Sequence, residues 1–322
     1  MEHVADPHLI QFRREQTHSF TIAFIVMTAL LLVAPFVFYP VFLMQALCFA
    51  LFACAFNLLI GYAGLVSFGH ALYFGWASYL CAYAAKSWHL PPLVAILIGT
   101  ATAAVLGVVA GWVAIRRQGI YFAMITLALA QMMYFFALRA PFTGGEDGIQ
   151  SVPRGRLFGV IDLTSETTMY FVVLVIVLGG FLLIYRIINS PFGEVLKAIR
   201  ENEQRAISLG YRTERYKLVA FVLSATLSGL AGALKALVFQ LASLTDVHWT
   251  MSGDVVLMTL VGGLGTVFGP VVGGFLIIAM QNYLAQFGQW VLVIQGAIFV
   301  VCVLAFRRGI VGELGARLGI KL

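Results

Sequence analysis

The sequence predicts an all-α polytopic membrane protein with about ten transmembrane helices and both termini in the cytoplasm. Hydrophobic residues make up 61% of the 322 residues and charged residues only 11%, whereas a soluble domain typically carries about 25% charge. The apolar stretches are long enough to cross about 30 Å of hydrocarbon as helices. A soluble fold is excluded because it would expose too much apolar surface to water.

The positions of the positive charges support this topology. Fifteen of the twenty Lys and Arg residues fall where a ten-span arrangement places one face of the membrane, at residues 13–14, 116–117, 186–217 and 307–321. The remaining five are scattered: Lys86, Arg139, Arg154, Arg156 and Lys235. Basic residues collect on the cytoplasmic side because short basic loops resist translocation. The net charge of +6 therefore follows topology and does not indicate nucleic-acid binding.

An arrangement of ten apolar spans places these basic groups on the same side of the membrane. We expect the spans at residues 19–38, 41–60, 64–86, 91–115, 119–138, 168–188, 217–241, 253–265, 266–285 and 289–306. Together they form a transmembrane domain (19–308) between cytoplasmic tails (1–18 and 309–322). The first span lacks the short apolar core and small-residue cleavage site of a signal peptide, so we expect a retained helix. The eighth is short enough to be a half-helix or a re-entrant segment instead.

A hydrophilic segment at residues 139–167 is expected outside the membrane. Its residues are typical of turns: Thr143, Gly144, Gly145, Asp147 and Gly148. We expect an ordered external loop, with a plain connector as the alternative.

A second hydrophilic segment, at about residues 190–210, is expected to be a short amphipathic helix at the cytoplasmic surface. Ser190 can cap it, Pro191 suits its first turn, and Gly210 supplies a left-handed stop. Apolar residues recur between these ends at helical spacing: Val195, Leu196, Ile199, Ala206 and Leu209. The segment is too charged to enter lipid and too amphipathic for a loose linker, so we expect it to bind a partner.

Polar and aromatic side chains inside the spans are candidates for a permeation pathway. They lie at the start of the third span and within the fifth: Ser67, Phe68, His70, Tyr73, Thr126 and Gln131. A polar group in a span should face the protein interior or an aqueous cavity, because lipid cannot satisfy it. The alternative is hydrogen bonding between helices, which we favour for His70 taken alone. Lys235 and Asp254 could pair, or Lys235 could reach the membrane surface.

Glycines mark two expected helix breaks or close-packing sites: Gly61, Gly64, Gly69, Gly263, Gly265 and Gly269. Each group is followed by a Phe-Gly pair, at residues 68–69 and 268–269. Broken helices in duplicated halves are common in transporters. Both copies have the same orientation in this topology, which an inverted repeat would not predict, so a true repeat stays an open alternative.

No catalytic residues and no metal site are predicted. The sequence contains no GxxxxGK motif followed by Ser or Thr, so the chain should not hydrolyse nucleotide itself. The four cysteines lie in apolar spans without metal-like spacing. We therefore expect a non-enzymatic chain that binds no cofactor.

Six motifs resemble the permease subunits of branched-chain amino acid ATP-binding cassette (ABC) importers, specifically the LivM type. They are residues 57–70 (NLLIGYAGLVSFGH), 119–127 (GIYFAMITL), 143–148 (TGGEDG), 198–203 (AIRENE), 216–218 (YKL) and 262–270 (GGLGTVFGP). The motifs extend over nearly the whole chain. The resemblance implies the fold of the LivH, LivM and RbsC permeases.

The resemblance also implies partners and a place in the bacterial inner membrane. These partners are a LivH-type permease, two cytoplasmic ATPases of the LivG and LivF type that use ATP and Mg, and a periplasmic solute-binding protein. The loop at 143–148 would then dock the binding protein. The amphipathic helix would be the coupling helix that docks on an ATPase, through Arg200, Glu201, Asn202, Glu203, Arg205, Ala206 and Gly210. Of the Glu-Ala-Ala-x-x-x-Gly pattern common in ABC permeases, only Ala206 and Gly210 match.

Two other functions remain as alternatives. An ion-coupled secondary transporter working alone would need carboxylates near the middle of the membrane, and none is expected there. A membrane scaffold without transport activity would not need the amphipathic helix. The solute could be a branched-chain amino acid or a related small polar or organic-acid compound.

Overall fold

The computed structural model describes residues 7–157, 161–288, 290–306 and 308–318. The helices are α1 (Pro7–Val33), α2 (Pro40–Asn57), α3 (His70–Lys86), α4 (Pro92–Ala114), α5 (Ile120–Arg139), α6 (Glu166–Ile188), α7 (Pro191–Glu201), α8 (Glu203–Ser208), α9 (Thr213–Phe239), α10 (Trp249–Gly262), α11 (Gly269–Leu284), α12 (Trp290–Ala305) and α13 (Gly309–Leu318). The strands are β1 (Ile149–Gln150), β2 (Arg156–Leu157), β3 (Ile161–Asp162) and β4 (Leu241–Ala242). The protein is mainly helical, as predicted.

Each of the ten predicted spans coincides with a helix. Six of these helices are long and apolar enough to cross a membrane: Pro40–Ala63, Pro92–Ala114, Ile120–Arg139, Glu166–Ile188, Thr213–Phe239 and Gly269–Phe287. The third span was predicted to start at residue 64, but α3 starts only at His70. Two further segments were predicted as tails. Helix α1 already begins at Pro7 and α13 occupies residues 309–318, whereas residues 1–6 and 319–322 lie outside the described part.

Proline sets the start of several helices. It occupies the first turn of α2, α4, α7 and α11, where its missing N–H has no intrahelical partner to lose and its fixed φ suits the helix. Glycine marks a helix end instead. At Gly64 φ is +72°, and the helical segment that continues α2 stops there.

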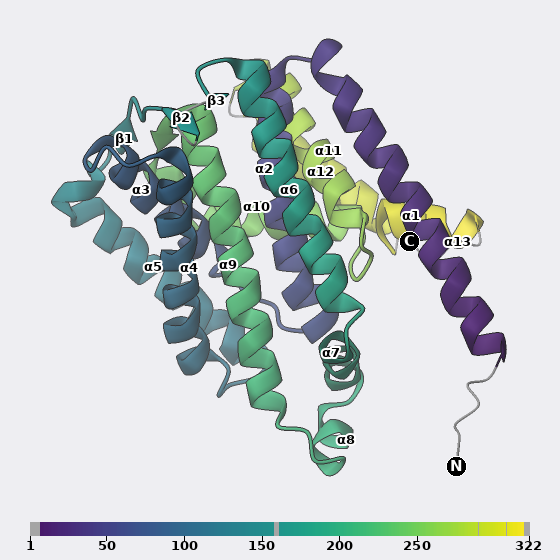
Figure 1. Ribbon diagram of the computed structural model, residues 1–322. Helices are drawn as coiled ribbons and strands as arrows, with labels where there is room; N and C mark the ends of the chain where they lie inside the picture. Colours follow the sequence, from purple (N-terminus) through teal and green to yellow (C-terminus); the bar gives the residue numbers. More distant parts are fainter. Residues whose placement is uncertain (1–6, 158–160, 289, 307, 319–322) are drawn as a thin grey trace.

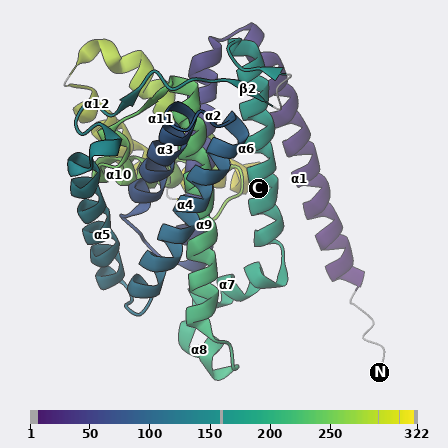
Figure 2. The same ribbon diagram turned by 60° about the vertical axis from the view of Figure 1, so that its left-hand side comes forward.

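Helix α2 lies at the centre of the bundle (Figures 1 and 2). In the most apolar stretch of Pro40–Ala63, 89% of the residues are buried, against 22% for α5, which lies at the flank. Beside α2, helices α3, α4 and α9 approach closely through small residues. A Cβ added at Gly232 would lie 2.0 Å from the carbonyl oxygen of Phe74, and one at Gly99 would lie 2.6 Å from that of Ala77. Such packing substitutes for hydrophobic association within lipid.

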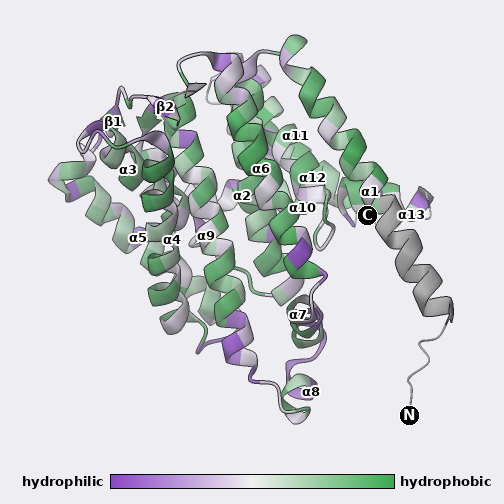
Figure 3. Cartoon of the chain, viewed as in Figure 1, coloured by the Kyte–Doolittle hydropathy of each residue, from purple (hydrophilic) through white to green (hydrophobic). Residues whose placement is uncertain are grey.

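The bundle has two distinct ends, which we name by their contents. The loop end carries residues 140–157, 161–165 and 240–248, where β1 pairs with β4 and β2 with β3, both antiparallel. The coupling end carries α7 and α8, and α8 extends beyond the other helices (Figure 1). Hydrophilic residues gather at both ends, and the bundle between them is mostly hydrophobic (Figure 3).

Candidate functional site

The first helix break separates α2 from α3. Helix α2 continues as a π-helix over Leu58–Ala63, and residues 64–69 are not helical. Helix α3 begins at His70, whose Nε2 lies 2.9 Å from the Ser224 hydroxyl, close to the middle of α9. The N-terminus of α3 therefore lies inside the bundle, not at its surface.

Buried hydroxyl groups satisfy the backbone around the start of α3. Ser252 of α10 accepts a hydrogen bond from the Ala71 N–H (2.9 Å), and Thr126 of α5 accepts one from the Phe68 N–H (3.2 Å). Ser67 accepts from the Gly69 N–H (3.2 Å). The first N–H groups of a helix lack intrahelical partners, so these side chains cap a helix that begins in an apolar interior.

His70 connects three helices. The Ser224 hydroxyl donates to the carbonyl oxygen of Ala55 (2.6 Å), so it must accept from Nε2–H of His70. The ring makes edge contacts with Tyr73 and Phe221, and its Nδ1 atom is buried with no hydrogen-bond partner among the described residues. These contacts favour the packing role for His70.

The structure gathers five of the six predicted pathway residues around the start of α3. Ser67, His70, Tyr73 and Thr126 are at most 2% exposed, whereas Phe68 is partly exposed. Gln131 lies further along α5 and is also partly exposed. Their contacts account for helix packing in this conformation, and a role in permeation stays a prediction.

A cavity of about 240 Å³ opens between this break and the first turn of α5. Its lining residues are Gly64, Leu65, Val66, Gly119, Ile120, Phe122 and Ala123. All of these side chains are apolar or absent, so only backbone groups could recognise a polar solute there.

The second helix break separates α10 from α11. Thr266 caps α11 by accepting from the Gly269 N–H (3.1 Å) and donates to the Gly263 carbonyl (2.8 Å). The first Phe-Gly pair stands directly before α3, and the second spans the start of α11, whose first residue is Gly269. The two breaks also touch, because Asn57 Oδ1 accepts from the Gly265 N–H (3.0 Å). The predicted break glycines therefore belong to one region.

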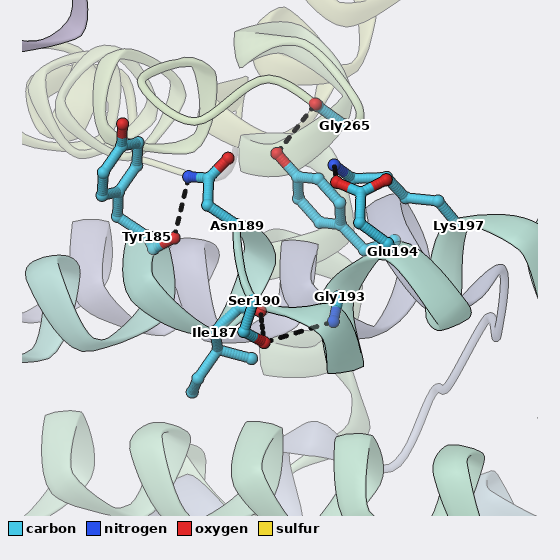
Figure 4. Close-up of polar contacts among 9 residues, drawn as sticks. Tyr185, Ile187, Asn189, Ser190, Gly193, Glu194, Lys197 and Gly265 are labelled. Carbon is cyan, nitrogen blue, oxygen red and sulfur yellow. Dashed lines mark hydrogen bonds and ion pairs between the residues drawn. The ribbon is translucent and has the colours of Figure 1, made fainter. Parts of the chain in front are cut away.

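The predicted amphipathic segment starts as expected but is not one helix. Ser190 caps α7 by accepting from the Gly193 N–H (3.4 Å) while donating to the carbonyl of Ile187 (2.6 Å), as Figure 4 shows. Asn202 then leaves the helical conformation and caps α8 through the Arg205 N–H (3.0 Å). The prediction of a single helix was wrong because this Asn bonds the following backbone more readily than it continues a helix.

The coupling lobe, α7 and α8 with residues 209–211, presents an exposed tip. Of the apolar residues that recur at helical spacing, Leu196, Ile199 and Ala206 are buried and Val195 is half-buried. Leu209 is instead 70% exposed, beside the exposed Ile207 and Tyr211. Of the predicted coupling residues, Arg200, Glu201, Asn202, Arg205 and Gly210 are exposed. Glu203 forms an ion pair with Lys217 of α9 (2.5 Å). The lobe therefore presents apolar and charged groups that no described residue covers.

The predicted external loop is ordered by contacts to the loop end of the bundle. Thr143 is buried and donates to the carbonyls of Ala137 and Ala140, so it caps α5. Gly148 has φ +67°, and a Cβ there would lie 2.2 Å from the carbonyl oxygen of Ala242. Gly144 and Gly145 also have positive φ, and Asp147 is exposed. The glycines serve the loop conformation, while docking of a partner stays a prediction.

Charged side chains reinforce the loop end. Arg154 donates to the carbonyl of Val238 (2.7 Å) in the last turn of α9, and Lys86 donates to that of Gln150 (2.7 Å). Further along, Asp162 accepts from the hydroxyl and the N–H of Thr164 (2.6 and 3.0 Å). These two bonds lower the pKa of the Asp162 carboxyl.

Lys235 does not pair with Asp254. It forms a buried ion pair with Asp246 (2.7 and 2.9 Å), so both the expected Lys235–Asp254 pair and its alternative of reaching the surface were wrong. Asp254 instead receives long hydrogen bonds of 3.4 Å each from Gln281 and Gln295. Asp246 follows the predicted end of the seventh span, so it was not counted among the intramembrane charges.

Several residues at the site were not predicted. Asn57, Tyr62, Ser224 and Ser252 make hydrogen bonds between segments far apart in sequence. Asn57 carries an amide within an apolar run, so the rule that selected Ser67 could also have found it. Nothing in the sequence distinguishes Ser224 or Ser252 from other serines.

Residues 40–303 match the family described as the permease component of branched-chain amino acid transport systems. The chain is 25% identical over 293 residues to the high-affinity branched-chain amino acid transport system permease protein LivM of Escherichia coli, covering 82% of this chain and 68% of that protein. It is 28% identical over 196 residues to the ribose import permease protein RbsC of Bacillus subtilis, covering 56% and 58%. No solved structure matches it significantly.

A shorter alignment relates the chain to the probable LivH permease of Methanocaldococcus jannaschii, with 30% identity over 159 residues, 46% of this chain and 47% of that one. The family match covers most of the residues that form the bundle, both helix breaks and the coupling lobe. The chain therefore belongs to the family of permease components of branched-chain amino acid transport systems.

Proposed function

We propose that the chain is the transmembrane permease subunit of an ABC importer. It would translocate branched-chain amino acids or a related small polar or organic-acid solute. The observation that carries the proposal is the coupling lobe, which extends from one end of the bundle with Ile207, Leu209 and Tyr211 exposed (Figure 1). An ATPase that docks there would bury this surface, since exposed apolar groups at one site favour protein contacts.

In this proposal the bundle lies in the bacterial inner membrane with about ten transmembrane helices, and the coupling end and both termini face the cytoplasm. The supporting observation is that the basic groups at residues 116–117 and 186–217 flank spans that end at this side. The loop end would then face the periplasm. There, the exposed Glu146 and Asp147 of the ordered loop are available to a solute-binding protein.

The proposed partners are a LivH-type permease, two ATPases of the LivG and LivF type and the binding protein. The ATPases would use ATP and Mg, and this chain would bind no cofactor. Closure of the ATPases would move α7 and α8, and the bundle would shift between outward-open and inward-open states. The solute path would run beside the start of α3, where Phe68 is partly exposed, and past the partly exposed Gln131 further along α5.

The test is reconstitution of the chain with its partners in proteoliposomes. We expect solute uptake that requires ATP on the side of the membrane where the ATPases are bound. The uptake should also require the binding protein and should be inhibited by vanadate. A variant carrying Leu209→Glu and Ile207→Glu should lose ATPase co-purification, whereas Leu314→Glu, also at an exposed apolar residue but on α13, serves as the matched control.

Two outcomes would contradict this function. Vanadate-insensitive uptake by the chain alone would support the ion-coupled secondary transporter, for which Asp254 between Gln281 and Gln295 would be the first carboxylate to examine. Full uptake by a complex whose coupling lobe no longer binds ATPases would show that transport does not need the lobe. That result would favour the scaffold alternative, in which this chain does not itself carry out transport.

A further inference from the structure

One arginine of the coupling lobe lies against glycines of both helix breaks. The Arg200 guanidinium donates to the carbonyl oxygen of Gly61. Its aliphatic stem crosses Gly64, with Cγ 3.1 Å from the position that a Cβ would take there. Its Nη1 lies 3.3 Å from the corresponding position at Gly265. A Cβ at Gly64 or Gly265 would press against the arginine.

Next to this arginine, hydrogen bonds also join the two breaks directly. Asn57 accepts from the Gly265 N–H (3.0 Å) and donates to the carbonyl of Thr266 (2.9 Å). The Tyr62 hydroxyl donates to the carbonyl of Gly265 (2.9 Å). A Cβ at Gly61 would lie only 2.9 Å from the Gly265 nitrogen, so the backbones themselves are in contact.

We propose that Asn57, Gly61, Tyr62, Arg200 and Gly265 form a coupling junction that makes both breaks move together with the lobe. The Gly61 carbonyl ends a helix and carries partial negative charge, which a guanidinium satisfies. Asn57 and Tyr62 are only 3% and 5% exposed, so their bonds are protected from water. Arg200 therefore acts as a positioning residue: a displacement of α7 reaches α3 through the first break and α11 through the second.

This inference rests on the proposed function, so its test uses the whole reconstituted complex. Uptake and ATP hydrolysis are measured on the same proteoliposomes. We expect Arg200→Ala to lower the uptake per ATP hydrolysed by about five-fold or more, the lower range of a site-to-site coupling, and Tyr62→Phe to lower it by about two-fold. Arg200→Lys keeps one donor and should recover part of the loss.

The matched control is Tyr170→Phe. Tyr170 donates a hydroxyl bond to the carbonyl of Leu31 (2.6 Å), the same kind of bond as that of Tyr62 but between α6 and α1. The Tyr170→Phe variant should leave the uptake per ATP hydrolysed unchanged. A purely structural role for Tyr62 would lower the yield of assembled complex without changing this ratio, and would overturn the proposal.

A double-mutant cycle separates the junction from independent effects. Arg200→Ala combined with Asn57→Ala should cost less than the product of the two single effects, because both act on one unit. The Arg200→Ala and Tyr62→Phe pair gives a second cycle in case Asn57→Ala prevents assembly. The proposed junction is overturned if the two substitutions act independently in the cycle. It is also overturned if Arg200→Ala leaves the uptake per ATP hydrolysed unchanged. Failure of the proposed function appears separately, as absence of ATP-dependent uptake by the unmodified complex.

Discussion

The loop end and the coupling end of the bundle are held together by different interactions. At the loop end, charged groups tie the loop to the helix ends: Lys235 pairs with Asp246, and Arg154 donates to the last turn of α9. At the coupling end, Glu203 pairs with Lys217 and Arg200 donates to the Gly61 carbonyl, but the two helix breaks themselves meet through glycine backbones and the neutral groups of Asn57 and Tyr62.

This difference indicates which end can move. Breaking a buried ion pair by removing one partner costs about 3–5 kcal/mol, whereas a neutral hydrogen bond contributes only about 0.5–1.5 kcal/mol. The contact between the two helix breaks can therefore exchange its bonds at modest cost, while the loop end keeps its geometry. We expect conformational change to begin beside the coupling lobe, which is where a partner would act.

The largest effect should come from the loop end. Lys235→Met leaves the Asp246 carboxylate buried without a cation and should destabilise the protein by about 3–5 kcal/mol. The measurement is thermal unfolding of the detergent-solubilised protein. Lys235→Met combined with Asp246→Leu should recover most of the loss. If the single variant were as stable as the parent, the loop end would not be the rigid one.

The next effect concerns the coupling end. Gly61→Ala places a methyl group 2.3 Å from the Asn57 Oδ1 and 2.9 Å from the Gly265 nitrogen, so the two breaks must separate. We expect a loss of about 1–3 kcal/mol together with strongly reduced ATP-driven uptake. Gly179→Ala is the control, because a Cβ there meets nothing within 4 Å. Normal uptake by Gly61→Ala would mean that contact between the breaks is dispensable.

A smaller effect is expected for Arg154→Gln. This variant loses the guanidinium that donates to the carbonyl of Val238, at a cost of about 1 kcal/mol. Hydrogen exchange should rise in residues 149–156 while the uptake per ATP stays constant. A change in that ratio would show that the loop end also takes part in coupling, which would remove the distinction between the two ends.

The smallest effect is expected at Gly210, where φ is +88° and a Cβ would meet nothing within 4 Å. Gly210→Ala should cost about 1 kcal/mol through backbone strain alone. Gly210→Asn should cost less, because Asn tolerates the left-handed region. The amount of co-purified ATPase measures whether the lobe has shifted. Equal behaviour of Ala and Asn would show that this stop does not position the lobe.

The membrane class and the position of the helices could be predicted because they depend on local composition. Apolar length decides which segments can enter lipid, and Ser190 with Pro191 marks the start of α7 through its own side chain and ring. The clustered glycines extended this prediction to both helix breaks. The split of the amphipathic segment at Asn202 was not predicted. An Asn can either cap a helix or continue one, and its surroundings in the folded chain decide which conformation it adopts.

The sequence by itself determined the mainly helical membrane fold, the coupling segment and the glycines at which helices break, because lipid solubility and backbone freedom are local properties. Only the tertiary structure decided which partners meet: Lys235 with Asp246 instead of Asp254, His70 with Ser224, and Arg200 with the glycines of both breaks. Those choices depend on the depth and rotation of each helix. Packing against neighbouring helices sets both, and the spacing of residues along one segment contains no record of them.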